Sequence, residues 1–343
     1  MSKTGEKRCE YNLNSRSSTI DLFKFIASIL VVALHSKLFI EINDTIYFSV
    51  VNIICRLAVP FFAVCSGYFL SKSLSKNEYG AKPIKKQEWK MIKLYALWTL
   101  LYLLYSIPTW VKTGWMSFGA FKDYALATVT QGCHYHLWYL IGLIYALPVF
   151  YLCVRFIKYR KLLFVLMIAL YIIKAISYGY AWWLPTFMQT FFGIGGKFSA
   201  LFDAVFLLLP MLLLGFFISQ KKISLKFSLI GFIVSFSLLT VEAFTLKAFG
   251  QESVSFIFMT LPTAYFLFSL ISQMNWNLNG KVCTLLGAAS LVIYCFHPMI
   301  VGLFIDIVPS SILLFIIAAT VSVAVSFVFV FVKVKICMQW QKK

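Results

Sequence analysis

The stretch Asp21–Ser36, DLFKFIASILVVALHS, places a carboxylate, an amine and an imidazole in a segment otherwise apolar enough to cross a bilayer. In an α-helix, Lys24 and His35 lie about 20° apart around the axis and about 16 Å apart along it, so they share one face. Asp21 and Ser28 lie on that face too. A charge inside a spanning helix costs about 2.5–3.5 kcal/mol even on insertion scales, and such residues usually face a bundle interior or a wet cavity. We therefore expect a buried functional face.

Two interpretations of this face stay open. Asp21 and Lys24, three residues apart near the start of the helix, can form an ion pair at the membrane surface while Lys24 extends its amine to water. His35 lies three-quarters of the way along the segment and has no neighbour in sequence that would neutralise it. This position favours a functional role for His35 over a structural one.

The composition excludes a soluble globular chain. Of the 343 residues, 61% are apolar and only 13% are charged, about half the usual charged content. The fold class is therefore all-α, a polytopic integral membrane protein in a lipid bilayer. The net charge of +19 could indicate nucleic acid, but the basic residues gather in loops on one membrane side, so we expect no nucleic-acid partner.

Hydropathy predicts about ten transmembrane helices. The first apolar segment has no small-residue cleavage signal after it and is expected to be uncleaved. We divide the chain into a cytoplasmic tail 1–19, a transmembrane domain 20–332 and a cytoplasmic tail 333–343. The spans are expected near residues 20–40, 46–70, 92–110, 137–154, 162–178, 201–219, 227–245, 254–272, 282–304 and 311–332.

The basic residues set the orientation. In this scheme 23 of the 31 lysines and arginines fall in the two tails, at Lys281 and in the loops 71–93, 155–161 and 220–226. An excess of basic residues marks the cytoplasmic side, so both termini are predicted to be cytoplasmic. The opposite loops hold five: Lys112, Lys122, Lys174, Lys197 and Lys247. The stretch 176–200, aromatic and interrupted by Pro185 and three glycines, is expected to be an interfacial or re-entrant element.

Arg56, in NIICRLAVPFF, lies near the middle of the second span. An arginine stays charged at any ordinary pH, so it needs a carboxylate, carbonyl groups or a bound anion as partner. The structural alternative is a buried ion pair with an acidic residue such as Asp21 or Glu242. The functional interpretation is an anion-stabilising role.

The four histidines all lie in the outer half of the predicted membrane domain. His297, in SLVIYCFHPMI, lies about as deep in its span as His35 does in the first. His134 and His136 open the fourth span, and His136 with Trp138 is expected to shape a polar mouth. Without further ligands at suitable spacing we expect no metal site, and the eight cysteines lack the paired spacing of a disulfide framework.

Four segments carry a family resemblance. The run IDLFKFIASILVVALH resembles the first-helix signature of the acyltransferase 3 family of integral-membrane O-acyltransferases, a basic residue, usually Arg, followed after ten residues by His. RLAVPFFAVCSGYFL, HLWYLIGLIYALPVFY and SLVIYCFHP resemble its later motifs in the right order. The chain is most similar to short single-domain members that O-acetylate bacterial surface polysaccharide, because no hydrolase-like domain follows the last helix.

The resemblance implies roles for particular residues. His35 would be the catalytic histidine, and Lys24 stands where the family has Arg. Arg56 and the turn Ser66–Gly67–Tyr68 would be motif positions lining the passage to the active site. Because Lys offers a point charge where Arg offers a planar fork, bidentate contacts to a donor would be weakened.

The expected chemistry is acyl transfer from a thioester to a hydroxyl. A histidine has an ordinary pKa of about 6.5, so His35 can act as general base, contributing roughly 10²–10⁴-fold, or it can carry the acyl group covalently. Arg56 would stabilise the oxyanion, with Tyr68 or Tyr294 as weaker candidates. Asp21 and Lys24 would meet the donor at the inner end.

The expected donor is acetyl-CoA or another acyl-CoA from the cytoplasm, with no bound cofactor. The expected acceptor is a hydroxyl of a cell-envelope glycan or its lipid-linked precursor at a bacterial cell membrane, with His136, Trp138 and His297 among the substrate-binding residues. Aromatic residues at the outer mouth suit sugar rings or an ordinary interfacial belt: Trp110, Trp115, Tyr135, Trp138, Trp182 and Trp183.

The alternative function is a secondary transporter or polysaccharide exporter, since buried His, Arg and Asp also suit a proton-coupled carrier. Related membrane domains are thought to supply an amino acid to a fused enzyme, and no such partner domain is expected here. The sequence is compatible with a monomer or a homo-oligomer.

Overall fold

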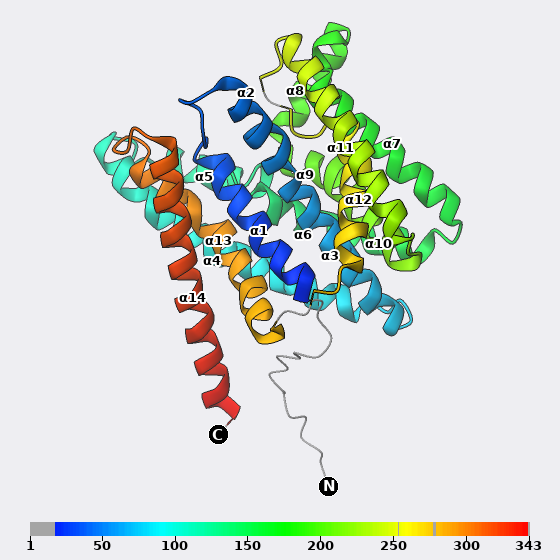
Figure 1. The fold of residues 1–343 in the computed structure, drawn as a ribbon. Coiled ribbons are helices and arrows are strands. Elements are labelled where there is room, and N and C mark those ends of the chain that lie inside the picture. Colours follow the sequence, from blue (N-terminus) through cyan, green and yellow to red (C-terminus); the bar gives the residue numbers. More distant parts are fainter. Residues whose placement is uncertain (1–17, 253, 277–278, 342–343) are drawn as a thin grey trace. The chain divides into compact units, whose positions relative to one another are not determined.

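The computed structural model of the protein describes residues 18–252, 254–276 and 279–341. Within them the chain forms helices and connecting loops without a β-strand, which confirms the all-α class (Figure 1). The elements are α1 (Ser18–His35), α2 (Asp44–Tyr47), η1 (Phe48–Ile54), η2 (Cys55–Leu57), α3 (Ala58–Lys76), α4 (Lys82–Lys112), α5 (Phe118–Thr130), α6 (Trp138–Phe156), α7 (Arg160–Gly179), η3 (Ala181–Trp183), α8 (Thr186–Lys197), α9 (Ser199–Asp203), η4 (Ala204–Leu208), α10 (Leu209–Gln220), α11 (Leu225–Ala248), α12 (Thr260–Gln273), α13 (Gly280–Phe304) and α14 (Ser311–Gln341).

Nine helices in the described part of the chain are long and apolar enough to cross a membrane. They correspond to nine of the ten predicted spans. The exception is 254–272, where the helix α12 begins only at Thr260 and has 14 residues, ending at Gln273. A 14-residue helix is about 21 Å long, shorter than the roughly 30 Å hydrocarbon layer. The segment 254–259 before it is not helical.

One compact unit contains the described residues up to Tyr47 and from Ile271 onward. In it α1 lies beside α13, and α14 packs on α13 (Figure 1). Asn279 caps α13, because its side-chain oxygen accepts from the backbone N–H of Lys281 at 3.0 Å. The core of this unit joins all three helices and consists of Val32, Ala289, Ile293, Ile300, Val301, Leu314 and Ala318.

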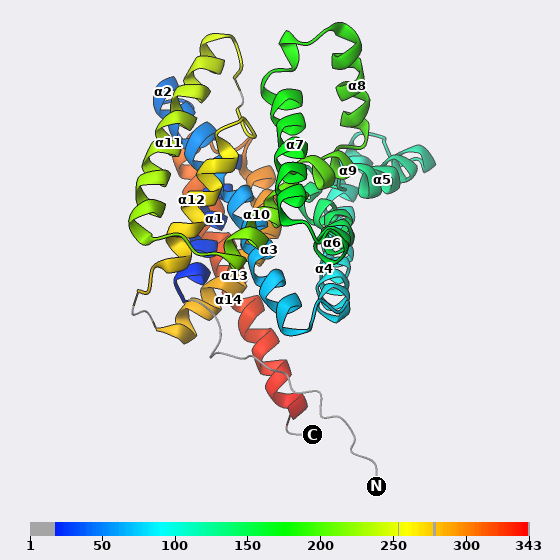
Figure 2. The same ribbon diagram turned by 90° about the vertical axis from the view of Figure 1, so that its right-hand side faces the viewer.

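The second unit comprises Phe48–Leu270. In this unit the backbones of α3 and α10 are in direct contact. A Cβ atom on Gly67 would lie 2.1 Å from the carbonyl oxygen of Leu212, and a Cβ atom on Gly215 would lie 2.2 Å from the carbonyl oxygen of Val64. Small residues at such contacts are typical of membrane helix pairs. Figure 2 shows the chain turning back at η3, between the end of α7 and α8.

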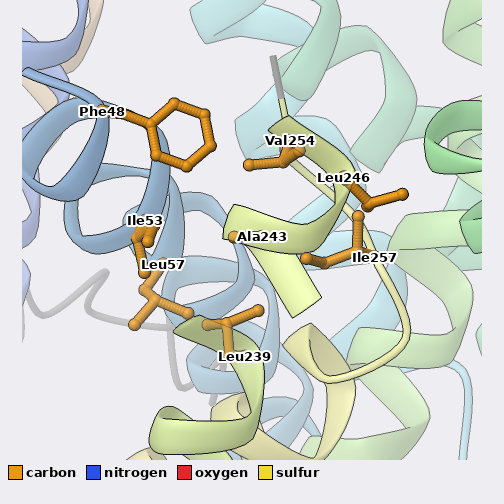
Figure 3. Close-up of a cluster of buried hydrophobic side chains, with 8 residues drawn as sticks. All are labelled: Phe48, Ile53, Leu57, Leu239, Ala243, Leu246, Val254 and Ile257. Carbon is orange, nitrogen blue, oxygen red and sulfur yellow. The ribbon is translucent and has the colours of Figure 1, made fainter. Parts of the chain in front are cut away.

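A cluster of buried apolar side chains joins three parts of the second unit (Figure 3). Phe48, Ile53 and Leu57 come from η1 and η2, and they meet side chains of α11 and of the segment that precedes α12. The other members of the cluster are Leu239, Ala243, Leu246, Val254 and Ile257.

The predicted loop 71–93 and the predicted interfacial or re-entrant stretch 176–200 are both largely helical. Most of the loop 71–93 belongs to α3 and α4, which leaves Asn77–Ala81 as the connection, and Pro83 is tolerated because it lies in the first turn of α4. The stretch 176–200 ends α7, forms the short turn η3 and continues as α8 after Pro185. Its glycines 193, 195 and 196 do not interrupt α8, which runs to Lys197.

The placement of Lys174 in an outer loop was wrong. Lys174 lies inside α7, is 6% exposed and forms an ion pair with Asp203 at 2.6 Å. A buried charge is tolerated there because the carboxylate compensates it. At the chain end, α14 continues nine residues past the predicted boundary of 332, to Gln341. Of the tail 1–19, residues 1–17 lie outside the described residues.

We predict that Gly67→Ala destabilises the protein. Its Cβ would overlap the Leu212 backbone, which cannot yield as a flexible side chain would, at a cost of about 1–3 kcal/mol or more. The melting temperature in detergent should fall and the monodisperse fraction should shrink. Gly119→Ala is the control, because its nearest neighbour would lie at an ordinary 3.5 Å. Equal melting temperatures for both variants would contradict the close α3–α10 contact.

Candidate functional site

The first part of the candidate site is a pair of histidines in the unit built on α1 and α13. The ring centroids of His35 and His297 lie 5.2 Å apart, with 30° between the ring planes. His35 is the last residue of α1 and is partly buried, whereas His297 is fully buried. The two imidazole rings therefore pack against each other at the end of an apolar helix.

The backbone orients His297. Its Nδ1 lies 3.0 Å from the carbonyl oxygen of Ile293. Because a carbonyl only accepts, Nδ1 carries the proton in this contact, and Nε2 is the basic nitrogen of the neutral ring. Tyr294 lies beside the ring, with centroids 6.3 Å apart. His297 thus presents a fixed ring to His35.

Asp21 and Lys24 form an ion pair of 2.9 Å within α1, as their spacing allows. The Asp21 side chain is 3% exposed and that of Lys24 is 22% exposed. Gly287 of α13 makes room for the carboxylate, because a Cβ atom there would lie 2.6 Å from Asp21 Oδ1. The pair is therefore packed against α13 and is more than a surface contact.

The turn after His35 is anchored on the start of α14. Lys37 and Phe39 have positive φ angles of 51° and 74°, which few residues other than glycine adopt without support. The Phe39 N–H donates to Ser311 Oγ at 3.0 Å, and the Glu41 carboxylate accepts from the Ser311 N–H. These contacts hold the chain that leaves His35.

In the second unit, Arg56 lies among hydrogen-bonding side chains. Its Nε donates to Asn52 Oδ1 at 3.0 Å and its Nη1 donates to Ser255 Oγ. The same Ser255 oxygen lies 3.1 Å from the Tyr178 hydroxyl. Arg56, Asn52, Ser255 and Thr260 line a cavity of about 10 Å³, room for about one water molecule.

The non-helical segment 254–259 is held by side chains of its neighbours. Tyr171 Oη donates to the Ile257 carbonyl at 2.8 Å. The Glu242 carboxylate accepts from the N–H groups of Phe258 and Met259, both at 2.8 Å, and from Tyr180 Oη at 2.5 Å. Irregular backbone is tolerated at membrane depth only where it is buried in protein or lines a cavity. These contacts supply partners that a helix would have supplied internally.

Of the acidic residues considered as partners of Arg56, Asp21 forms an ion pair with Lys24, and Glu242 accepts hydrogen bonds from the segment before α12. Sequence reasoning missed this role of Glu242 because it extended the eighth span across 254–259. Pro262, the third residue of α12, was the available signal, since proline is favoured in the first turn of a helix.

Trp138 and His136 lie in the second unit. The Trp138 ring packs edge-on against Phe256 of the segment 254–259, with centroids 6.3 Å apart. His136 is 1% exposed, and its Nδ1 lies 3.2 Å from that of His134. Burial lowers the pKa of His134 to about 4, so His134 is neutral at pH 7 and one ring nitrogen of the pair accepts from the other.

Ser66 and Tyr68 do not lie in a turn, as predicted, but inside α3. Gly67 between them provides a helix contact rather than a bend. Ser66 Oγ donates to the Phe62 carbonyl of its own helix at 2.9 Å, and the buried Tyr68 hydroxyl accepts from Lys72 Nζ at 2.6 Å. The structure thus brings together His35 with His297, Asp21 with Lys24, and Arg56 and Trp138 with the segment 254–259.

The fold and these clusters define a multi-pass α-helical membrane protein with histidine, arginine and carboxylate side chains inside it. A family model described as an acyltransferase domain matches residues 18–331. The chain therefore belongs to the acyltransferase 3 family, as its motifs indicate. No solved structure matches the chain.

Three curated relatives are similar to this chain. Two amino-acid racemases of Enterococcus faecalis are 28% and 27% identical, over 75% and 90% of this chain and 36% and 45% of their own lengths. A serine/alanine racemase of Enterococcus gallinarum is 28% identical over 82% of this chain and 40% of its own length. The chain spans less than half the length of these relatives, so their names describe much longer proteins.

We predict that Glu242→Gln loosens the segment 254–259. An amide has one acceptor oxygen in place of two, so it cannot serve both backbone N–H groups and Tyr180 equally well. Each charge-assisted hydrogen bond contributes about 1.5–3 kcal/mol. Hydrogen exchange of Phe258 and Met259 should accelerate at least tenfold. Glu252→Gln, an exposed change nearby, should leave it unaltered. Unchanged protection in Glu242→Gln would refute this role.

Proposed function

We propose that the protein is a membrane O-acyltransferase that moves an acyl group, an acetyl group in the simplest case, from cytoplasmic acyl-CoA to a hydroxyl of a cell-envelope glycan or its lipid-linked precursor. The observation that carries this proposal is the contact between His35 and His297 in a chain that belongs to the acyltransferase 3 family. A bacterial cell membrane would be its site of action.

In the proposed reaction His35 takes the proton of the acceptor hydroxyl while its oxygen bonds to the thioester carbonyl carbon. The carbon–sulfur bond then breaks, and the proton passes to the leaving CoA thiolate. His297, whose ring is fixed by the Ile293 carbonyl, would hold the His35 ring in position. In the alternative route, His35 itself receives the acyl group and passes it to the acceptor.

Arg56 would stabilise the oxyanion of the tetrahedral intermediate. Its guanidinium is held by Asn52 and Ser255, and a donor group fixed before the reaction costs no reorganisation as negative charge develops.

Lys24 would meet the phosphates of acyl-CoA at the inner end of α1. In the structure Lys24 forms an ion pair with Asp21. The carboxylate holds the amine in place and offsets its positive charge. The ion pair would orient the Lys24 amine toward the donor. A lysine would suffice at this position, because binding a single phosphate does not require the planar fork of arginine.

A transporter remains the second candidate, and the interrupted helix before α12 is the observation that favours it. Discontinuous helices with exposed backbone groups commonly form the substrate sites of carriers. Here those backbone groups are occupied by Glu242 and Tyr171, which supports a structural explanation of the interruption and hence the enzyme.

The proposed function is tested on the envelope glycan itself. A deletion strain, its complemented parent and a strain complemented with His35→Ala should be compared by mass spectrometry and proton NMR before and after mild alkali. We expect base-labile acetyl groups only with the wild-type gene, while His35→Ala inserts in the membrane and stays monodisperse. Identical acetyl content in all three strains would contradict the proposal.

The donor role of Lys24 needs a variant that leaves no buried charge behind. Lys24→Ala strands the Asp21 carboxylate, which is destabilising in itself, so the informative variant is Asp21→Asn with Lys24→Met. We expect it to fold and to raise the KM for acetyl-CoA about tenfold, with little change for S-acetylpantetheine, which lacks the nucleotide phosphates. Lys24→Arg should keep the wild-type KM. An equal rise in KM for both donors would rule out phosphate recognition by Lys24.

A further inference from the structure

A cleft of about 470 Å³ opens at the end of α7, within the second unit. Its walls come from the last turn of α7, from η3, from α8 and from the loop after α11. The volume lies within the range of small-molecule sites, about 300–1,000 Å³. The lining residues are Ser177, Tyr178, Ala181, Trp182, Gln189, Phe192 and Gln251.

The lining combines aromatic faces with neutral hydrogen-bonding groups. Three of the seven residues are aromatic, one is a serine and two are glutamines, and none of the seven is charged. A sugar ring has the matching surface, with apolar C–H faces and hydroxyl groups around its edge. The phosphates of acyl-CoA would meet no cation in this lining. The nearby Lys174 is already paired with Asp203 at 2.6 Å.

The side chains of the cleft are held before any ligand binds. Trp182 Nε1 donates to the Gly179 carbonyl at 3.2 Å, and its ring packs against Phe249 with centroids 5.6 Å apart. Gln189 Nε2 donates to the Leu184 carbonyl at 2.7 Å, which leaves the amide oxygen as an acceptor. Such preorganisation lowers the entropy cost of binding.

The cleft is joined to Arg56 by hydrogen bonds. The Tyr178 hydroxyl, on the cleft wall, lies 3.1 Å from Ser255 Oγ, and Ser255 accepts from the Arg56 guanidinium. The cleft also lies at the end of α7 opposite the basic residues 155–161, which is the outer end in the orientation that the basic loops predict. The contact between the cleft and Arg56 thus runs through the side chains of Tyr178 and Ser255.

We propose that this cleft binds a neutral sugar ring of the acceptor, with Trp182 as the stacking platform and Gln189 as a hydroxyl-binding group. This inference rests on the proposed function, since it assigns the acceptor site of that reaction. It also distinguishes two neighbouring tryptophans whose ring centroids lie 5.1 Å apart: Trp182 lines the cleft, whereas Trp183 does not and is 68% exposed.

Binding is measured by saturation-transfer NMR on the full chain in phosphatidylcholine nanodiscs, because sugar-based detergents would compete for the cleft. The probes are methyl β-glucopyranoside and N-acetylglucosamine, with glycerol as a polyol that has no ring. We expect saturation of at least one sugar and none of glycerol. Trp182→Ala should weaken the signal at least fivefold, Gln189→Ala should weaken it less, and Trp183→Ala should retain it.

Either of two results would overturn the cleft as a sugar site. One is no saturation of either sugar in the wild type. The other is equal signals in Trp182→Ala and Trp183→Ala, which would assign both residues to an interfacial belt.

The same variants separate this inference from the proposed function. His35→Ala should bind the sugar as the wild type does and yet add no acetyl groups to the envelope glycan. If Trp182→Ala acetylates the glycan fully while His35→Ala does not, the function stands and the cleft assignment fails. If glycan acetylation is unaffected by His35→Ala but sugar binding still depends on Trp182, the cleft stands and the acyltransferase proposal fails.

Discussion

Inside a bilayer every backbone polar group needs a hydrogen-bond partner from the protein. In the non-helical segment 254–259 of the second unit, Glu242 provides this partner for two backbone N–H groups. Its carboxylate accepts the N–H groups of Phe258 and Met259, which allows the chain to run unwound before α12 begins. The unwound segment then presents Ser255 to Arg56 and Phe256 to Trp138. One half-buried carboxylate thus supports the surroundings of two motif residues.

In the first unit, polar side chains inside the protein are paired with one another. Asp21 compensates Lys24, and His297 lies against His35 with its own proton held by a backbone carbonyl. The histidines join α1 to α13, and Gly287 of α13 makes room for the buried Asp21 carboxylate of α1. The family signature in α1 is therefore accompanied by a matching set of positions in α13.

The repeating patterns in the sequence were sufficient for nine of the ten predicted spans, because apolar length and helical periodicity are local properties. They were insufficient for 254–272, because the residues 254–259 are mostly apolar and yet not helical. The backbone of these residues forms hydrogen bonds with Glu242 and Tyr171, which are distant in sequence. Lys174 was counted in a loop although the predicted span 162–178 contains it, and the carboxylate that compensates its charge, Asp203, lies 29 residues away. Ser66–Gly67–Tyr68 was taken for a turn because the backbone contact of Gly67 with Leu212 is a tertiary feature.

The account is tested most directly by the fate of the thioester. Purified protein in lipid nanodiscs, given acetyl-CoA and a lipid-linked glycan precursor from the same cells, should release free CoA and form an O-acetylated product in equal amounts. Movement of the precursor across a vesicle membrane without any release of CoA would contradict the acyltransferase function and establish the protein as a carrier.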